Sequence, residues 1–149
     1  MSDKWTWKTA HQSPGAGIII VKQISNEWKI LGLWCRGGYD IPKGHTEENE
    51  SALETAIREC REEVNITNLK FTWGIKKIIL NKLTVYIAET EEPAEIVPND
   101  KTGIYEHEFF HWLDWNTMYK STYHYLKPAI IWAKDLIYLE DKNSEITNT

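Results

Sequence analysis

The residues best suited to chemistry are four charged side chains close together in the sequence: Arg58, Glu59, Glu62 and Glu63. In a helix, the three glutamates would be three to four residues apart and would share one face. Three carboxylates on one face repel each other unless cations lie among them. Hard oxygen ligands suit Mg²⁺, with Mn²⁺ as a substitute, together with substrate phosphates. The cluster therefore predicts a divalent-cation site; the alternative is an acidic, solvated helix face.

A helix over residues 51–64 is expected to position these glutamates. Its apolar side chains recur at helical spacing and predict one buried face, made of Ala52, Leu53, Ala56, Ile57, Cys60 and Val64. Ser51 and Glu54 have the spacing of a capping box at the start of the helix. Asn65 is suited to end it, because asparagine accepts the left-handed backbone conformation found at helix C-termini.

Residues 44–66 read G-x5-E-x7-R-E-C-x-E-E-x-N-I. This stretch resembles the Nudix box, G-x5-E-x7-R-E-U-x-E-E-x-G-U, where U is an aliphatic-type residue. The second glycine of the pattern is replaced by Asn65, which tolerates the same backbone region. The resemblance implies the α/β class and the Nudix fold, an α/β/α sandwich with a mixed β-sheet.

The resemblance also implies roles for individual residues. Glu59, Glu62 and Glu63 correspond to the family's metal ligands, and the main-chain carbonyl of Gly44 corresponds to a further ligand. Glu50 and Arg58 correspond to an ion pair that braces the loop against the helix.

The implied reaction is attack of a metal-activated water on phosphorus, with a carboxylate accepting the proton. Two residues are candidates for this base: Glu63 within the box, and Glu106 in a later loop, which is also a candidate metal ligand.

Residues 39–45 (YDIPKGH) resemble the W-x-x-P-K-G-H segment of asymmetric dinucleoside tetraphosphate hydrolases, with Tyr39 in place of tryptophan. In that setting Lys43 would hold a polyphosphate chain and His45 would add a hydrogen bond to phosphate. The alternative interpretation is that Lys43 is a solvated loop lysine.

Residues 106–113 (EHEFFHWL) resemble the E-H-x-x-Y-x-W-L segment of the animal-type diadenosine tetraphosphate hydrolases, which places Glu106 at that group's late acidic position. Tyr86 is the closest candidate for an adenine-stacking tyrosine, and it is equally well explained as a core residue. The expected reaction converts diadenosine tetraphosphate to ATP and AMP. Three alternatives remain: pyrophosphate removal from RNA 5′ ends, hydrolysis of ADP-ribose or several related compounds, and a nucleotide-binding Nudix domain without catalysis.

The composition fits one domain over residues 1–140, followed by a polar, disordered tail over residues 141–149. The net charge of −5 argues against a broad nucleic-acid surface, so we expect a small nucleotide substrate, with RNA 5′ ends as the exception. We find neither a membrane span nor a secretory signal, and therefore expect a cytoplasmic protein. Cys35 and Cys60 are expected to be reduced packing residues. The oligomeric state is left open.

Alternating and β-branched segments predict the remaining elements. We expect a hairpin from residues 15–22 and 28–34, strands over 69–79, 83–88 and 109–113, and a loop over 91–100. A second helix should follow, with Pro128 in or near its first turn. Mixed strands flanked by two helices complete the expected architecture.

Overall fold

The computed structural model describes residues 14–147, so expectations about residues 1–13 and 148–149 lie outside it. The strands are β1 (Gly15–Ile24), β2 (Glu27–Cys35), β3 (Gly38–Asp40), β4 (Lys43–His45), β5 (Lys77–Leu80), β6 (Leu83–Glu89) and β7 (Phe109–Leu113). The helices are α2 (Ala52–Val64), α3 (Trp115–Ser121) and α4 (Lys127–Thr147), with a short 3₁₀ turn, η1 (His124–Leu126), before α4.

The sheet is mixed, as predicted. Its strands run in the order β3-β2-β1-β6-β5, with β4 paired to β1 and β7 paired to β2. The β1–β6 pair is parallel, and the other pairs are antiparallel. The predicted hairpin joins β1 to β2 through Ser25 and Asn26, both with positive φ (54° and 65°). Two such residues form the turn that matches the twist of the paired strands.

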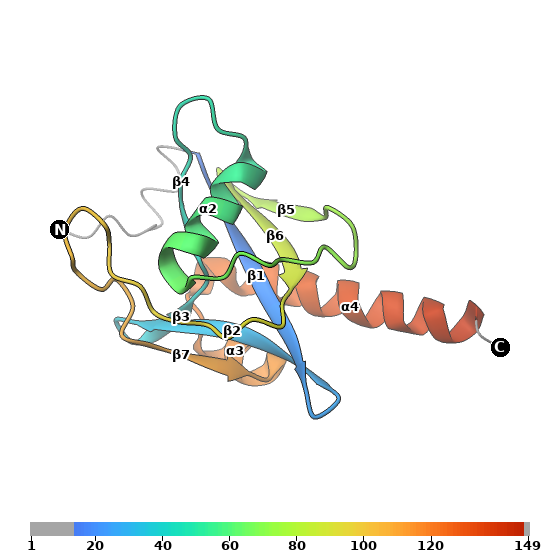
Figure 1. Cartoon of the computed structure of the whole chain (residues 1–149). Coiled ribbons are helices and arrows are strands. Elements are labelled where there is room, and N and C mark those ends of the chain that lie inside the picture. Colours follow the sequence, from blue (N-terminus) through green and yellow to red (C-terminus); the bar gives the residue numbers. More distant parts are fainter. Residues whose placement is uncertain (1–13, 148–149) are drawn as a thin grey trace.

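Both faces of the central sheet are covered, which explains the continuous apolar run in β1. Ile18 and Ile20 pack toward α2, whereas Ile19 and Val21 belong to a second cluster shared with α3 and α4. Neighbouring side chains of a strand point to opposite faces, so a strand buried on both sides needs apolar residues at every position. Figure 1 shows α2 on one side of the sheet and α4 on the other. The predicted α/β/α sandwich is therefore confirmed.

The predicted strand over residues 69–79 is wrong for most of its length. Only Lys77–Leu80 forms a strand there, and Lys70 makes an isolated bridge to Glu89. Gly74, at a φ of 86°, closes a turn by donating its N–H to the carbonyl of Phe71. The β-branched and aromatic residues suggested a continuous strand, but the glycine turn interrupts it.

The helices also differ from the expectation. A third helix, α3, begins after Asp114, whose side chain accepts the backbone N–H of Thr117. The second predicted helix is present as α4, with Pro128 at its second position, and it extends to Thr147, into the segment that we expected to be a disordered tail. Ile57 on α2 is exposed rather than part of the buried face. Within residues 14–147, no helix has the length and apolar character needed to cross a membrane.

Candidate active site

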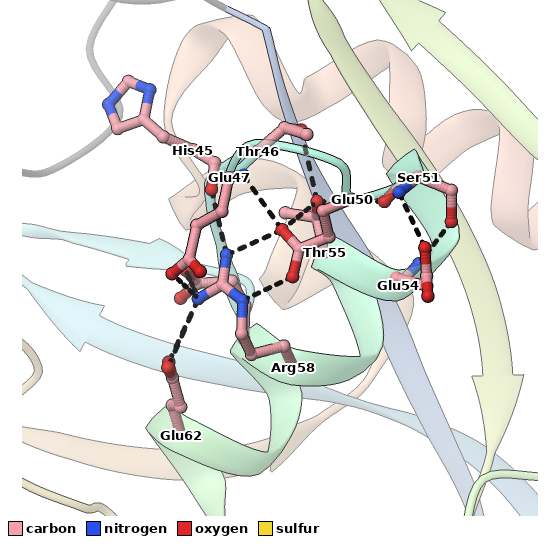
Figure 2. A network of polar contacts seen from close by, with 10 residues as sticks. His45, Thr46, Glu47, Glu50, Ser51, Glu54, Thr55, Arg58 and Glu62 are labelled. Atoms are coloured by element: carbon pink, nitrogen blue, oxygen red, sulfur yellow. Dashed lines mark hydrogen bonds and ion pairs between the residues drawn. The ribbon is translucent and has the colours of Figure 1, made fainter.

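Arg58 connects the helix α2 to the loop that precedes it. Its Nε lies 2.7 Å from Glu50 Oε2, and its Nη2 donates to Glu50 Oε1 and to the carbonyl of His45, each at 3.0 Å (Figure 2). Glu50 also accepts from the Thr55 hydroxyl and from the backbone N–H of Glu47. These donors, above all Arg58, lower the pKa of Glu50 to about 2. The predicted ion pair is therefore present and braces the loop.

Both ends of α2 have the predicted caps. The Ser51 side chain accepts the backbone N–H of Glu54, and the Glu54 side chain accepts the N–H of Ser51. Asn65 follows the last residue in the left-handed conformation, with φ 55° and ψ 36°, and donates its N–H to the Arg61 carbonyl. These caps fix where the helix begins and ends, and hence the orientation of its glutamates.

The three glutamates of α2 project toward the same cleft in different environments. Glu59 Oε1 lies 2.9 Å from Arg58 Nη1, and Glu62 Oε2 lies 3.1 Å from the same nitrogen. Burial raises the pKa of the Glu59 carboxyl to about 7, although Arg58 opposes the shift. Burial and the neighbouring Glu59 raise the pKa of Glu63 well above its ordinary value. Desolvated, crowded carboxylates of this kind favour a bound cation.

The cleft in front of these glutamates has a volume of about 420 Å³. Its walls come from β4 and the following loop, from α2, from the loop over residues 97–102 and from residues 106–107. The predicted site residues that line it are Lys43, Gly44, His45, Arg58, Glu59, Glu62, Glu63 and Glu106. Glu106, distant from the box in sequence, therefore opens onto the same space as the three helical glutamates.

Gly44 lies so close to the Glu59 carboxylate that any larger residue would have to displace it. A Cβ at this position would be 2.2 Å from Glu59 Oε1. The glycine at the start of the motif is thus needed for close approach of the loop to the helix, a recognised use of glycine.

Comparison with known proteins identifies the family. The NUDIX domain pattern matches residues 11–133, most of the chain. The chain belongs to the NUDIX family. With the glutamates of the Nudix box intact, it is a Nudix hydrolase. A comparison with curated protein sequences finds no match.

Solved structures share the Nudix fold at low sequence identity. A C. elegans Ap4A hydrolase, in a binary complex, is 19% identical with a TM-score of 0.68, covering 83% of this chain and 98% of that one. A Listeria monocytogenes NUDIX hydrolase is 16% identical with a TM-score of 0.68, covering 87% and 97%. The E. coli dihydroneopterin triphosphate pyrophosphohydrolase is 21% identical with a TM-score of 0.57, covering 78% and 90%. At these identities the likeness shows the fold alone.

The Nudix box offers suitable donors for a divalent cation. Among residues 14–147, no three His, Cys, Asp or Glu side chains already surround a common point. Glu59 and Glu62 turn instead toward Arg58 Nη1, so a cation would have to replace this nitrogen as their neighbour. Arg58 would retain Glu50 through Nε and Nη2. Glu59, Glu62, Glu63 and Glu106 line the cleft together, and burial raises the pKa of two of them, Glu59 and Glu63. Such a set of carboxylates fits a hard cation.

Three of the predicted substrate-binding side chains are buried or paired with other protein groups. Lys43 points its Nζ inward to Asp40 Oδ2, at 2.9 Å. Its side chain is 3% exposed, so the alternative of a solvated loop lysine is wrong, and its contact with a polyphosphate chain stays a prediction. Tyr86 is buried among the core residues packed against α2. Tyr39 is buried on the opposite face of the sheet, with its hydroxyl 2.8 Å from His111 Nδ1. Neither tyrosine lines the cleft. The core interpretation of Tyr86 is the correct one.

Sequence reasoning assigned no role to Asp40, His107 or Lys101. Asp40 and His107 are buried polar residues, and His107 lines the cleft beside Glu106. Lys101 is exposed on the loop over residues 97–102, where Asn99 Oδ1 accepts the backbone N–H groups of Lys101 and Thr102. His107 falls inside the E-H-x-x motif, so its position was visible, but its burial was not.

Proposed function

We propose that this Nudix hydrolase uses Mg²⁺ to cleave a phosphoanhydride bond in a nucleoside-diphosphate-linked compound, with diadenosine tetraphosphate as the substrate and ATP and AMP as products. The observation that supports the metal site is that Glu59, Glu62, Glu63 and Glu106 line one cleft directly beside Gly44. The substrate assignment is supported by the Pro-Lys-Gly-His and Glu-His segments and by the shared fold of the C. elegans Ap4A hydrolase.

In this proposal the four glutamates and the Gly44 carbonyl hold the cation. The bound cation supplies positive charge beside the phosphate oxygens and makes a water molecule more acidic. Glu106 accepts the proton of the attacking water, because its side chain is partly exposed at the cleft, whereas Glu63 is buried and accepts the Lys43 backbone N–H at 2.8 Å. Arg58 and Glu50 keep the loop and the helix in register.

Substrate phosphates require positively charged or hydrogen-bonding groups at the surface of the cleft. Arg58 and Lys43 are engaged with carboxylates. Among the described residues lining the cleft, Lys101 is the lysine whose side chain is exposed, and His45 is partly exposed on the other wall. We assign phosphate contacts to Lys101 and His45 in place of Lys43.

A panel of substrates, read by product identity, tests the proposed function. With Mg²⁺ and diadenosine tetraphosphate we expect ATP plus AMP. Two molecules of ADP would contradict the asymmetric assignment. Preferential release of pyrophosphate from RNA 5′ ends, or of AMP from ADP-ribose, would replace the proposed substrate. Failure to turn over any of these compounds would favour a binding domain.

The metal assignment is tested by Glu62→Gln, which removes charge while keeping size. We expect kcat to fall at least about 100-fold, because the lost ligand acts on charge that develops in the transition state. The exposed Glu108→Gln serves as a matched control. Full activity of the Glu62 variant would contradict its role as a ligand.

The phosphate role of Lys101 is tested by Lys101→Met. We expect KM for diadenosine tetraphosphate to rise about tenfold, or about 1.4 kcal/mol, with a smaller change in kcat. Lys134→Met, an exposed lysine on α4, is the matched control and should leave KM unchanged. Equal KM values for the two variants would remove Lys101 from the site.

A further inference from the structure

A buried polar cluster lies directly behind the cleft. It consists of Asp40 on β3, Lys43 on β4, Glu63 on α2 and His107 before β7, with exposed fractions of 1%, 6%, 8% and 3%. Three of these residues, Lys43, Glu63 and His107, also line the cleft. The cluster therefore connects the core of the protein to the glutamates of the Nudix box.

His107 lies between the two buried carboxylates. Its Nε2 is 3.5 Å from Asp40 Oδ2, and its Nδ1 is 3.6 Å from Glu63 Oε1. Asp40 is itself fixed, because Oδ2 accepts Lys43 Nζ at 2.9 Å and Oδ1 accepts the Ile41 backbone N–H at 2.8 Å. Each nitrogen of the imidazole ring thus faces one carboxylate.

The second oxygen of Glu63 is also held. Glu63 Oε2 accepts the backbone N–H of Lys43 at 2.8 Å. Lys43 therefore contacts both carboxylates, Glu63 through its main chain and Asp40 through its side chain. Burying such charges is costly, and well-packed apolar residues in their place are often neutral or more stable. Because such a cluster often makes the fold no more stable than apolar residues would, we interpret it as a means of positioning side chains. Residues that hold metal ligands in place commonly have this role.

We propose that Asp40 and His107 are positioning residues that orient the Glu63 carboxylate for the cation. The inference rests on the proposed metal-binding function. Asp40 holds the imidazole through Nε2, the ring places Nδ1 beside Glu63 Oε1, and Lys43 N–H fixes the other oxygen. Loss of this support would leave the carboxylate present but misdirected.

Two substitutions of His107 distinguish the roles of its two ring nitrogens. The amide nitrogen of asparagine can occupy the place of Nδ1, and that of glutamine the place of Nε2. Mn²⁺ affinity is measured by calorimetry without substrate. We expect His107→Gln to weaken binding about 10- to 100-fold, the usual effect of losing such a support. His107→Asn, which keeps a donor beside Glu63 but gives up the contact with Asp40, should weaken binding less than His107→Gln. Equal affinities of both variants and the unsubstituted protein would overturn the inference.

Glu63→Gln distinguishes failure of the inference from failure of the proposed function. If Glu63→Gln leaves Mn²⁺ affinity intact, the metal assignment itself fails. If it weakens binding but His107→Gln does not, only the positioning role fails. Because His107 acts through Glu63, the variant that combines Glu63→Gln with His107→Gln should bind Mn²⁺ no more weakly than Glu63→Gln alone. An additive loss of affinity would contradict the inference.

Two controls complete the experiment. His111→Gln changes an exposed histidine that contacts Tyr39 and not these carboxylates, and it should leave Mn²⁺ affinity unchanged. Asp40→Asn, which keeps the size of the side chain, should weaken Mn²⁺ binding about as much as His107→Asn, and it tests the inference if the His107 variants do not fold. Unchanged affinity in a folded Asp40→Asn protein would also overturn the inference.

Discussion

Arg58 divides its hydrogen-bond donors between two tasks. Nε and Nη2 hold Glu50 and the His45 carbonyl, which ties the loop to α2. Nη1 faces Glu59 and Glu62, the two carboxylates that a cation would also contact. The bonds to Glu50 can persist while a metal ion replaces Nη1 as the neighbour of Glu59 and Glu62. One guanidinium can thus brace the backbone and neutralise the site before a cation binds.

The close approach of Gly44 to Glu59 predicts the effect of adding one methyl group. Gly44→Ala places Cβ 2.2 Å from Glu59 Oε1 and must displace that carboxylate. Because the clash involves the end of a flexible side chain, we expect little change in the free energy of unfolding. Mn²⁺ affinity measured by calorimetry should fall by about an order of magnitude. In a Glu59→Ala background the same substitution should have no further effect, and an equal loss there would contradict this explanation.

Glu50 predicts a specific acid sensitivity. Its pKa is lowered from 4.5 to about 2 in the folded protein, chiefly by Arg58. A depressed pKa gives stability that is present above pH 4.5 and is lost as the pH falls toward about 2. Urea unfolding should therefore show a steeper loss of stability over this range for the unsubstituted protein than for Glu50→Gln. Glu48→Gln, an exposed neighbour, should retain the steep loss. Identical dependence of stability on pH in the unsubstituted protein and both variants would exclude a contribution of Glu50 to acid sensitivity.

At the scale of elements, local signals predicted α2 and the β1–β2 hairpin well. The capping box of Ser51 and the left-handed Asn65 are encoded within a few residues, and the structure has both. The strand predicted over residues 69–79 failed because a turn at Gly74 separates the bridge at Lys70 from the strand that begins at Lys77. The helix α3 was missed because seven residues give too short a repeat to recognise.

The candidate site likewise contains residues that the sequence predicted well and residues that it predicted poorly. Residues whose role follows from spacing along α2, such as Glu59 and Glu62, were predicted and line the cleft. Side chains whose direction depends on which neighbouring groups become buried were not predicted correctly. Lys43 is drawn inward by the buried Asp40, and Tyr86 is covered by the packing of α2 on the sheet. A strand of three residues, such as β4, is too short for an alternating pattern to show which side chains become buried.

The end of α2 tests how backbone geometry supports the Nudix box. Asn65 has a φ of 55°, a conformation that costs a residue such as alanine about 1 to 2 kcal/mol. We expect Asn65→Ala to lower the free energy of unfolding by about 1 kcal/mol in urea titrations. Asn65→Gly, which restores the family residue, should retain or increase stability and leave activity unchanged. Equal stability of the alanine and glycine variants would show that the left-handed conformation at residue 65 does not affect the free energy of unfolding.

The whole molecule carries a net charge of −5, and six carboxylate side chains line one cleft, among them Glu59, Glu62, Glu63 and Glu106. Repulsion among these groups opposes folding unless something offsets it. The layered core of sheet and helices supplies the stability that allows such a site to exist. Binding of a cation to the folded state alone should then stabilise the entire domain, because the separated glutamates of an unfolded chain form no site.

This linkage gives a prediction for the intact protein. At Mg²⁺ concentrations about 100 times the dissociation constant, the free energy of unfolding should rise by about 2.7 kcal/mol over that in EDTA at equal ionic strength. Glu62→Gln should lose most of this increase, because it removes a ligand charge while keeping the fold. Glu140→Gln, an exposed residue near the end of α4, should retain it. An equal increase in all three proteins would mean that Mg²⁺ acts through general screening of charge rather than through the cleft.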